Sequence, residues 1–174
     1  MKRVLNSKGK RGDALEKEQF ERAAAKYMDN VFAVAFNYFR DQAEADDIVQ
    51  EVLFKLLKSD TDFESDEHIR NWMLKVAVNQ CRKVSVSSWF RRSAPLEEYA
   101  ETLRYEDPEE SALFFAVMGL PKKYRVVIHL FYYEDYSTAE IAEMLKMNES
   151  TVRSRLRRAR MKLKEVLKDG WEDE

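Results

Sequence analysis

The amino-acid sequence predicts an all-α protein built from two small helical domains, and three observations support this fold class. The 174 residues are 45% hydrophobic, which is enough to bury one modest core or two small ones. Only 4 Gly and 3 Pro are present, so the residues that tight hairpin turns require are scarce. Apolar residues recur at helical spacing through most of the chain. Long helices joined by short polar loops are therefore expected.

The first helical domain is predicted over residues 13–92. Apolar positions between residues 13 and 40 fit one or two helices, and further helices are indicated at 45–57 and 69–80. Residues 84–88 alternate weakly like a strand, but no partner strand is predicted elsewhere. A loop is therefore expected there.

The second helical domain is predicted over residues 112–168, and its apolar periodicity indicates four helical segments. Between the domains, residues 93–111 are acidic and carry Pro95 and Pro108, which is typical of a flexible linker. The chain ends are expected to be a flexible basic tail at 1–12 and an acidic tail at 169–174.

Charge is strongly segregated along the chain. The net charge of −2 would by itself argue against nucleic-acid binding. However, residues 41–67 carry 10 acidic and 2 basic residues, whereas 68–92 carry 6 Arg and Lys and no acid. Residues 94–112 are again acidic, and 151–168 hold 8 basic residues against Glu165. Such blocks indicate several partners.

Catalysis and membrane insertion are not expected. The single Cys81 cannot form an internal disulfide, and the basic start is not followed by the apolar stretch of a secretory signal, so the cytoplasm is the expected compartment. The apolar runs fall short of the roughly 20 residues that a membrane span needs. His68, His129 and Cys81 form no obvious dyad, and no phosphate-binding glycine loop exists. We expect no cofactor and no metal.

The most specific local pattern lies at residues 136–167. Ser137 begins a capping box, in which its hydroxyl accepts from the Glu140 amide while the Glu140 carboxylate reaches back to the helix start. A turn of about three residues follows, and Asn148 can cap the next helix. Lys146 stands in this turn, where a left-handed conformation would cost about 1 kcal/mol. The pattern predicts a helix-turn-helix.

The second helix of this motif has one apolar face and one basic face. At about 100° per residue, the apolar face gathers Val152, Leu156, Ala159, Leu163 and Val166. Ser154, Arg157 and Arg158 point away from it, and Arg153, Arg155 and Arg160 lie on the flanks. In a recognition helix, outward residues reach base edges and flanking cations hold phosphates. The alternative is a basic helix that is simply solvated. It is disfavoured because the capping box, the turn and the arginine spacing occur together in one motif.

Three segments resemble extracytoplasmic-function (ECF) sigma factors of the sigma-70 family, in the expected order. AEADDIVQEVL at 43–53 resembles their core-polymerase-binding segment, and NWMLKVAVN at 71–79 resembles their promoter-melting segment. LPKKYR at 120–125, followed by residues 137–167, resembles their second conserved domain. The resemblance implies a sigma region 2-like domain and a helix-turn-helix region 4-like domain.

The resemblance also implies roles for individual residues. Core polymerase would be bound by Asp47, Gln50, Glu51 and Phe54, although this acidic helix could instead be a solvated face. The −10 DNA would be contacted by Arg70, Lys75, Asn79, Arg82 and Lys83. Phe63 would stack on a flipped −10 base, which is worth about 1–3 kcal/mol, while Trp72 is expected to anchor the core. The −35 bases would be read by Ser154, Arg157 and Arg158, and the −35 phosphates held by Arg153, Arg155 and Arg160.

The expected function is therefore that of an alternative sigma factor, the non-catalytic specificity subunit of RNA polymerase. Its partners would be core RNA polymerase, double-stranded and melted promoter DNA, and an anti-sigma factor. The linker would thread through the polymerase, although a plain disordered connector fits its composition equally well. The alternative function is a free-standing helix-turn-helix regulator that binds an operator without polymerase.

Overall fold

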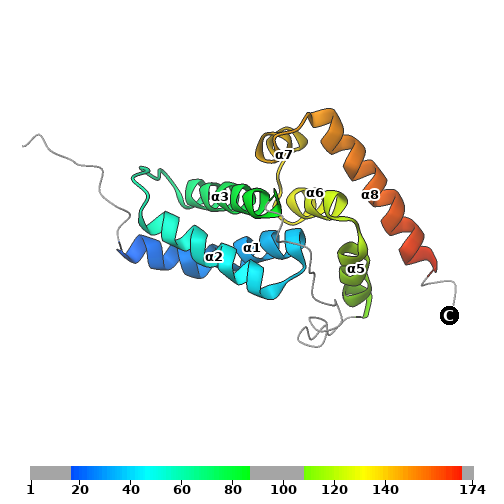
Figure 1. Ribbon diagram of the computed structural model, residues 1–174, viewed down its shortest axis with the longest axis horizontal. Helices are drawn as coiled ribbons and strands as arrows, with labels where there is room; N and C mark the ends of the chain where they lie inside the picture. The colour runs from blue at the N-terminus through cyan, green and yellow to red at the C-terminus, as the bar shows by residue number, and fades with distance from the viewer. Residues whose placement is uncertain (1–16, 87–107, 170–174) are drawn as a thin grey trace, which may run out of the picture.

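The computed structural model describes residues 17–86 and 108–169, and in these ranges the chain forms α-helices and no strand (Figure 1). The all-α prediction is confirmed. The basic tail at 1–12, the linker residues 93–107 and the acidic residues 170–174 lie outside the described residues.

The first domain is a bundle of α1 (Lys17–Phe39), α2 (Gln42–Leu57) and α3 (Asp66–Val86). The segment expected to hold one or two helices is the single helix α1. It ends where Arg40 adopts a left-handed conformation with φ 54°. Asp41 caps α2, because its carboxylate accepts a hydrogen bond from the Glu44 amide at 2.9 Å. α2 therefore folds back on α1 after a short turn.

Apolar side chains from all three helices fill the core of the first domain. The largest of those that are less than 2% exposed are Val31, Val34, Val52, Leu56, Ile69, Met73, Leu74 and Val78. Full burial of a side chain of this size stabilises a fold by about 1.5–3 kcal/mol.

α3 extends to Val86, so the loop expected from residue 84 is wrong for residues 84–86. Val84 packs partly buried against the hydrophobic core. Valine and serine are weak helix formers, but packing on a core outweighs intrinsic propensity. The alternation in this segment therefore misled the sequence-based prediction.

The second domain contains α5 (Pro108–Gly119), α6 (Lys122–Tyr132), α7 (Thr138–Leu145) and α8 (Glu149–Asp169). α5 begins before the boundary expected at Ala112, so part of the predicted linker is helical. Pro108 occupies the first helical position, where its fixed φ suits the helix and its missing N–H is not needed.

The two domains pack against each other (Figure 1): α6 lies against α1, and α7 lies against α3. Polar contacts cross this boundary. The buried Arg125 of α6 donates to the Asn37 carbonyl of α1 at 2.6 Å. The Tyr136 hydroxyl donates to Asn71 Oδ1 of α3 at 2.8 Å, and burial raises the pKa of Tyr136 to about 12, so the hydroxyl keeps its proton at neutral pH. No described helix has the length and apolar character needed to cross a membrane.

Candidate nucleic-acid interface

The helix-turn-helix has the predicted capping box at its start. The Ser137 amide donates to Glu140 Oε2 at 2.8 Å, and the Glu140 amide donates to the Ser137 hydroxyl at 3.3 Å. These hydrogen bonds hold the Glu140 carboxylate in its charged form, and its pKa is lowered accordingly. α7 therefore begins at a fixed position relative to the preceding loop.

The turn after α7 places α8. Lys146 adopts the left-handed conformation, with φ 52° and ψ 54°. The Met147 amide donates to the Ala142 carbonyl at 3.0 Å, and α8 begins directly after Asn148. The Thr138 hydroxyl donates to Glu149 Oε1 at 2.6 Å, which ties the starts of the two helices together.

Replacing Lys146 with glycine is expected to raise the free energy of unfolding of the second domain by about 1 kcal/mol. Glycine adopts the left-handed conformation without the steric cost that a Cβ carries. Lys164→Gly in the interior of α8 is the matched control, and it should lower stability by about 1 kcal/mol. Urea unfolding of both variants would measure the difference. A loss of stability in both would contradict the expected strain at Lys146.

The apolar face of α8 packs as expected over its first half. Val152, Leu156 and Ala159 are at most 2% exposed, and Leu163 is partly buried. Val166, which the helical periodicity also places on this face, is 54% exposed. Val166 lines a shallow pocket between α8 and α5, where the two helices do not close over it, so periodicity there does not imply burial.

The residues expected to face DNA lie on the opposite side of α8. Ser154, Arg157 and Arg158 are exposed. Of the flanking cations, Arg153 forms an ion pair with Glu149 at 3.3 Å, and Arg160 donates to the Tyr132 hydroxyl at 2.7 Å. Arg155 is half-buried and faces the boundary between the domains.

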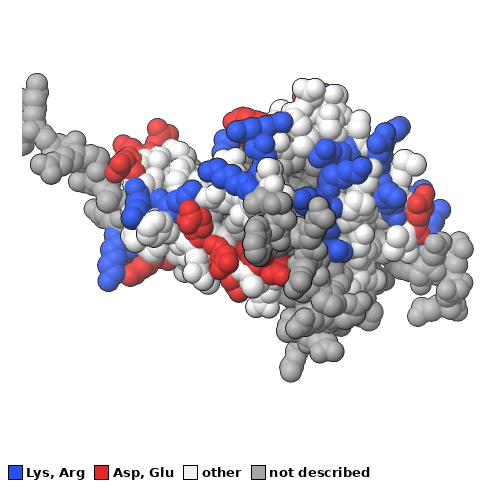
Figure 2. All heavy atoms as spheres, in the orientation of Figure 1, with Lys and Arg blue, Asp and Glu red and all other residues white. Residues whose placement is uncertain are grey.

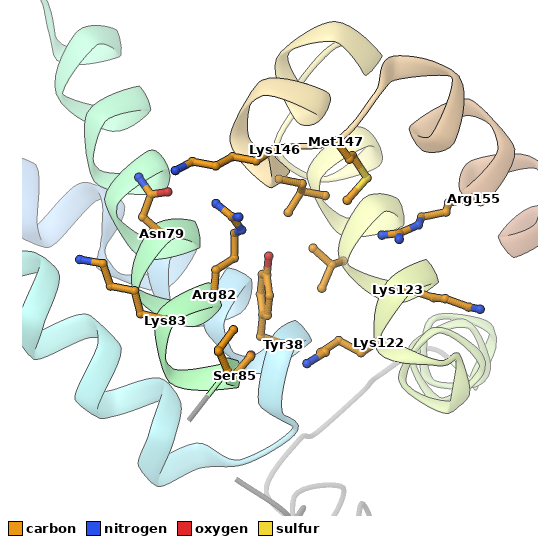
Figure 3. Close-up of a pocket in the computed structure, with 13 residues that line it drawn as sticks. Tyr38, Asn79, Arg82, Lys83, Ser85, Lys122, Lys123, Lys146, Met147 and Arg155 are labelled. Carbon is orange, nitrogen blue, oxygen red and sulfur yellow. The ribbon is translucent and has the colours of Figure 1, made fainter. Parts of the chain in front are cut away.

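A basic cleft of about 900 Å³ lies at that boundary (Figure 3). Within residues 17–86 and 108–169, its lining includes no carboxylate and has cations from both domains: Arg82, Lys83, Lys122, Lys123, Lys146 and Arg155. In Figure 3 the side chains of Arg82 and Arg155 approach the cleft from opposite sides. On the face that Figure 2 shows, Lys and Arg gather where α3 meets α6 and α7, and along α8.

The residues expected to contact the −10 DNA fall into two groups along α3. Asn79, Arg82 and Lys83 line the basic cleft. Arg70 and Lys75 instead pair with acids of the second domain. Arg70 lies 2.7 Å from the Glu134 carboxylate, and Lys75 lies 3.8 Å from that of Glu143.

Phe63 is less exposed than its loop position suggested. It is partly buried against the core, and its ring meets those of Trp72 and His68 edge-on, with centroids 5.7 and 5.3 Å apart. Trp72 is also partly buried on the core, in agreement with its expected anchoring role.

The residues expected to bind core polymerase lie on an exposed face of α2. Asp47, Gln50 and Glu51 are exposed, and Phe54 is 52% exposed. Glu51 forms an ion pair with Lys55 at 3.4 Å and accepts from Gln80 Nε2 of α3 at 3.2 Å. The face thus combines an aromatic side chain with carboxylates, a composition suited to a protein partner more than to nucleic acid.

Two charged residues at the domain boundary were not singled out from the sequence. Arg125 is 3% exposed and Glu134 is 2% exposed. His129, noted in the sequence only as a poor catalytic candidate, donates to or accepts from Glu134 Oε1 at 3.1 Å. The available signal was weak: Arg125 directly precedes the apolar run Val126–Ile128, and Glu134 follows an aromatic pair.

Comparison with known proteins agrees with this architecture. The family model described as Sigma-70 region 2 matches residues 24–94, and that described as Sigma-70, region 4 matches residues 112–163. ECF RNA polymerase sigma factor SigL of Mycobacterium tuberculosis (strain Erdman) is 30% identical over 137 residues, covering 74% of this chain and 77% of that protein. RNA polymerase sigma factor SigV of Bacillus subtilis (strain 168) is 29% identical over 140 residues, covering 76% and 81%.

A solved structure has the same fold. It is the sigma factor RpoE from Bartonella quintana, crystallised with the anti-sigma factor NepR, and it aligns with a TM-score of 0.62 and 21% identity. The alignment covers 87% of this chain and 98% of that one. The two matched regions and the relatives, which are matched over more than three quarters of their length, agree: the chain belongs to the ECF sigma factors of the sigma-70 family.

Proposed function

We propose that this sigma factor binds core RNA polymerase through α2 and directs it to promoters by contacting the −10 element through α3 and the −35 element through α8. One observation carries the proposal. α8 presents Ser154, Arg157 and Arg158 to solvent directly opposite its buried stripe, at the start of a helix that the capped turn holds in place. This is the arrangement that major-groove recognition requires.

The basic cleft supports the assignment of α3. Arg82 and Lys83 line this cleft from α3, and cations in such a position suit contact with phosphates. In the proposal, Phe63 stacks on a flipped −10 base. Its ring lies edge-on against Trp72, in the loop before α3 toward which the base would be flipped.

The chemistry of RNA synthesis belongs to the polymerase, and the sigma factor supplies specificity. Because it acts together with core RNA polymerase on DNA, it functions in the bacterial cytoplasm. An anti-sigma factor is a further partner, and the fold shared with RpoE, which was crystallised with one, supports this. The free-standing regulator is disfavoured, because relatives matched over most of their length are named as sigma factors.

Charge reversal on α2 tests the proposal. Asp47→Lys together with Glu51→Lys is expected to weaken core-polymerase binding by about tenfold or more, since like charges placed across an interface repel. Purified wild-type protein should give start-site-specific transcription with core enzyme, and the variant should not at the same concentration. Circular dichroism would verify that helix content is unchanged.

Glu18→Lys with Glu21→Lys on α1 is the matched control, because it makes the same change in net charge at exposed positions. It should leave binding within about twofold of wild type. If the α2 variant binds as well as this control, α2 is not the docking surface. If the wild type binds an operator without polymerase and fails to start transcription with it, the sigma-factor role is overturned.

A further inference from the structure

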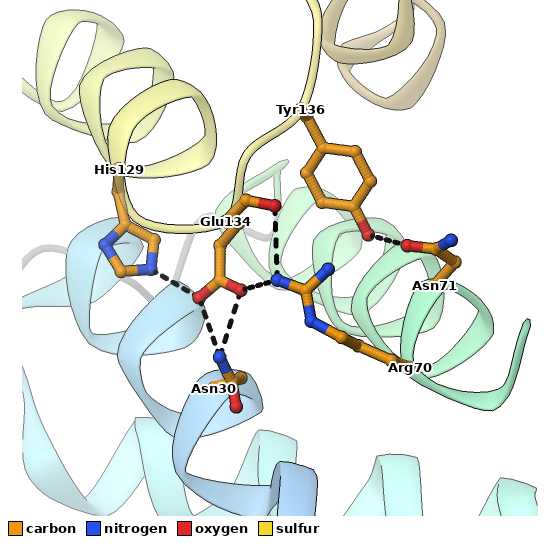
Figure 4. Close-up of polar contacts among 6 residues, drawn as sticks. All are labelled: Asn30, Arg70, Asn71, His129, Glu134 and Tyr136. Carbon is orange, nitrogen blue, oxygen red and sulfur yellow. Dashed lines mark hydrogen bonds and ion pairs between the residues drawn. The ribbon is translucent and has the colours of Figure 1, made fainter. Parts of the chain in front are cut away.

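A buried carboxylate joins the two domains (Figure 4). Glu134, in the loop between α6 and α7, is 2% exposed, and polar side chains contact its carboxylate from three sides. Arg70 of α3 donates to its Oε2 at 2.7 Å, and Asn30 of α1 donates to the same oxygen at 3.1 Å. His129 of α6 lies 3.1 Å from Oε1. The carboxylate therefore takes two of its partners from the first domain.

Glu134 also holds Arg70 through its backbone. The Arg70 guanidinium donates to the Glu134 carbonyl at 3.1 Å in addition to the carboxylate contact. Arg70 is one of the cations assigned to the −10 DNA under the proposed function. In this arrangement, an acid of the second domain occupies the site on Arg70 that a phosphate would take.

Binding at two promoter elements requires the domains to separate. Positions −35 and −10 are about 25 base pairs apart, which is about 85 Å at about 3.4 Å per base pair. Here Asn79 and Arg82 of α3 line one cleft together with Arg155 of α8. The surfaces assigned to the two elements thus face each other across a single cleft, and the closed arrangement cannot engage both elements at once.

The closed arrangement also gathers like charges. Among the described residues, the cleft brings cations of both domains together without a carboxylate in its lining, and the mutual repulsion of these cations favours opening. Contacts across the boundary offset this repulsion, among them those of Arg125 with Asn37 and of Tyr136 with Asn71. The buried Glu134 cluster supplies an attraction of opposite sign at the same boundary.

We propose that Glu134 is an autoinhibitory latch: it holds the free sigma factor closed by occupying Arg70 and Asn30, and it must release them before the protein engages both promoter elements. This inference rests on the proposed function. A closed majority reduces the apparent affinity for promoter DNA in proportion to the fraction of molecules that are open. Loosening the latch therefore strengthens binding without adding a contact.

Two variants loosen the latch from opposite sides. Glu134→Gln removes the charge that faces Arg70, and Asn30→Asp places a second carboxylate against Glu134. Glu143→Gln is the matched control, because it removes an acid from the same boundary whose carboxylate is 76% exposed and lies 3.8 Å from Lys75. Circular dichroism and thermal unfolding of each full-length variant identify any that fails to fold.

Small-angle X-ray scattering of the free protein, and promoter titration with holoenzyme at saturating core polymerase, test the latch. We expect both latch variants to have a larger radius of gyration than wild type and to bind a promoter carrying both elements about tenfold more tightly, while Glu143→Gln matches wild type on both measures. An unchanged radius of gyration in both folded variants would overturn the latch. Expansion with unchanged promoter affinity would overturn its inhibitory role. If the latch variants expand but neither they nor the wild type bind core polymerase, the proposed function is overturned, while the role of Glu134 in holding the domains together is supported.

Discussion

Replacing Arg125 with methionine is expected to lower the free energy of unfolding by about 3–5 kcal/mol. Arg125 Nε donates to the Asn37 carbonyl at 2.6 Å, and NH1 donates to the Leu120 carbonyl at 2.7 Å. Methionine fills similar volume but donates nothing, and each buried carbonyl left without a donor costs about 1–3 kcal/mol.

The position of Arg125 explains why a buried cation is stable there. Asn37 is near the end of α1 and Met118 is near the end of α5, where helix carbonyls lack intrahelical donors and the helix dipoles are negative. Burial, together with the nearby charge of Arg40, lowers the pKa of Arg125 to about 10, so the guanidinium remains charged at neutral pH. It therefore joins two helix ends that belong to different domains.

Two variants distinguish this role from simple packing. Arg40→Met removes one hydrogen bond, to the Met118 carbonyl at 3.1 Å, and should cost about 1 kcal/mol. Arg125→Lys keeps the positive charge but loses the planar guanidinium. Its loss in the free energy of unfolding should therefore lie between those of Arg125→Met and Arg40→Met. Urea unfolding followed by circular dichroism gives all three values. Equal losses for Arg125→Met and Arg40→Met would show that the carbonyl contacts of Arg125 are not what stabilises the boundary.

The sequence was sufficient for features that depend on local patterns. Helical periodicity located the helices because each buries one stripe, and the Ser-x-x-Glu pattern located the start of α7 because both partners lie within one turn. Lys146 was expected in a turn and is left-handed there. Periodicity was less reliable at helix ends, where packing decides the outcome. It missed that α3 continues to Val86, and it placed Val166 on a buried face although the side chain is 54% exposed.

The sequence was not sufficient for the contact between the domains. That boundary depends on isolated polar residues whose partners are distant in the chain, as with Asn30 and Glu134, which are 104 positions apart. No periodic pattern marks such pairs. For the same reason, the sequence predicted that α3 would carry cations but not that Arg70 would pair with a carboxylate of the other domain.

Alanine at Arg157 or Arg158 is expected to weaken promoter binding by about 1–3 kcal/mol and to relax the preference at one or two −35 base positions. Both side chains are exposed in the first turns of α8, opposite the buried Val152 and Leu156. A bidentate contact between an arginine and a guanine favours guanine over other bases by about 1–3 kcal/mol. Losing that contact therefore lowers both the affinity and the preference for guanine at that position.

Arg160→Ala should behave differently. The Arg160 guanidinium lies over the rings of Phe131 and Tyr132 and donates to the Tyr132 hydroxyl, which fixes it on the flank of the helix. From there it can hold a phosphate but cannot reach a base edge. Its loss should weaken all −35 sequences alike and reduce the slope of log affinity against log salt by about one unit.

Binding of the holoenzyme to a set of −35 mutants across a salt series separates the two effects. Lys164→Ala is the control, because it removes an exposed cation of α8 farther from the turn and should change neither base preference nor affinity by more than about twofold. If Arg157→Ala, Arg158→Ala and Arg160→Ala all weaken every sequence equally, α8 holds DNA through phosphates alone, and −35 specificity must come from another part of the protein.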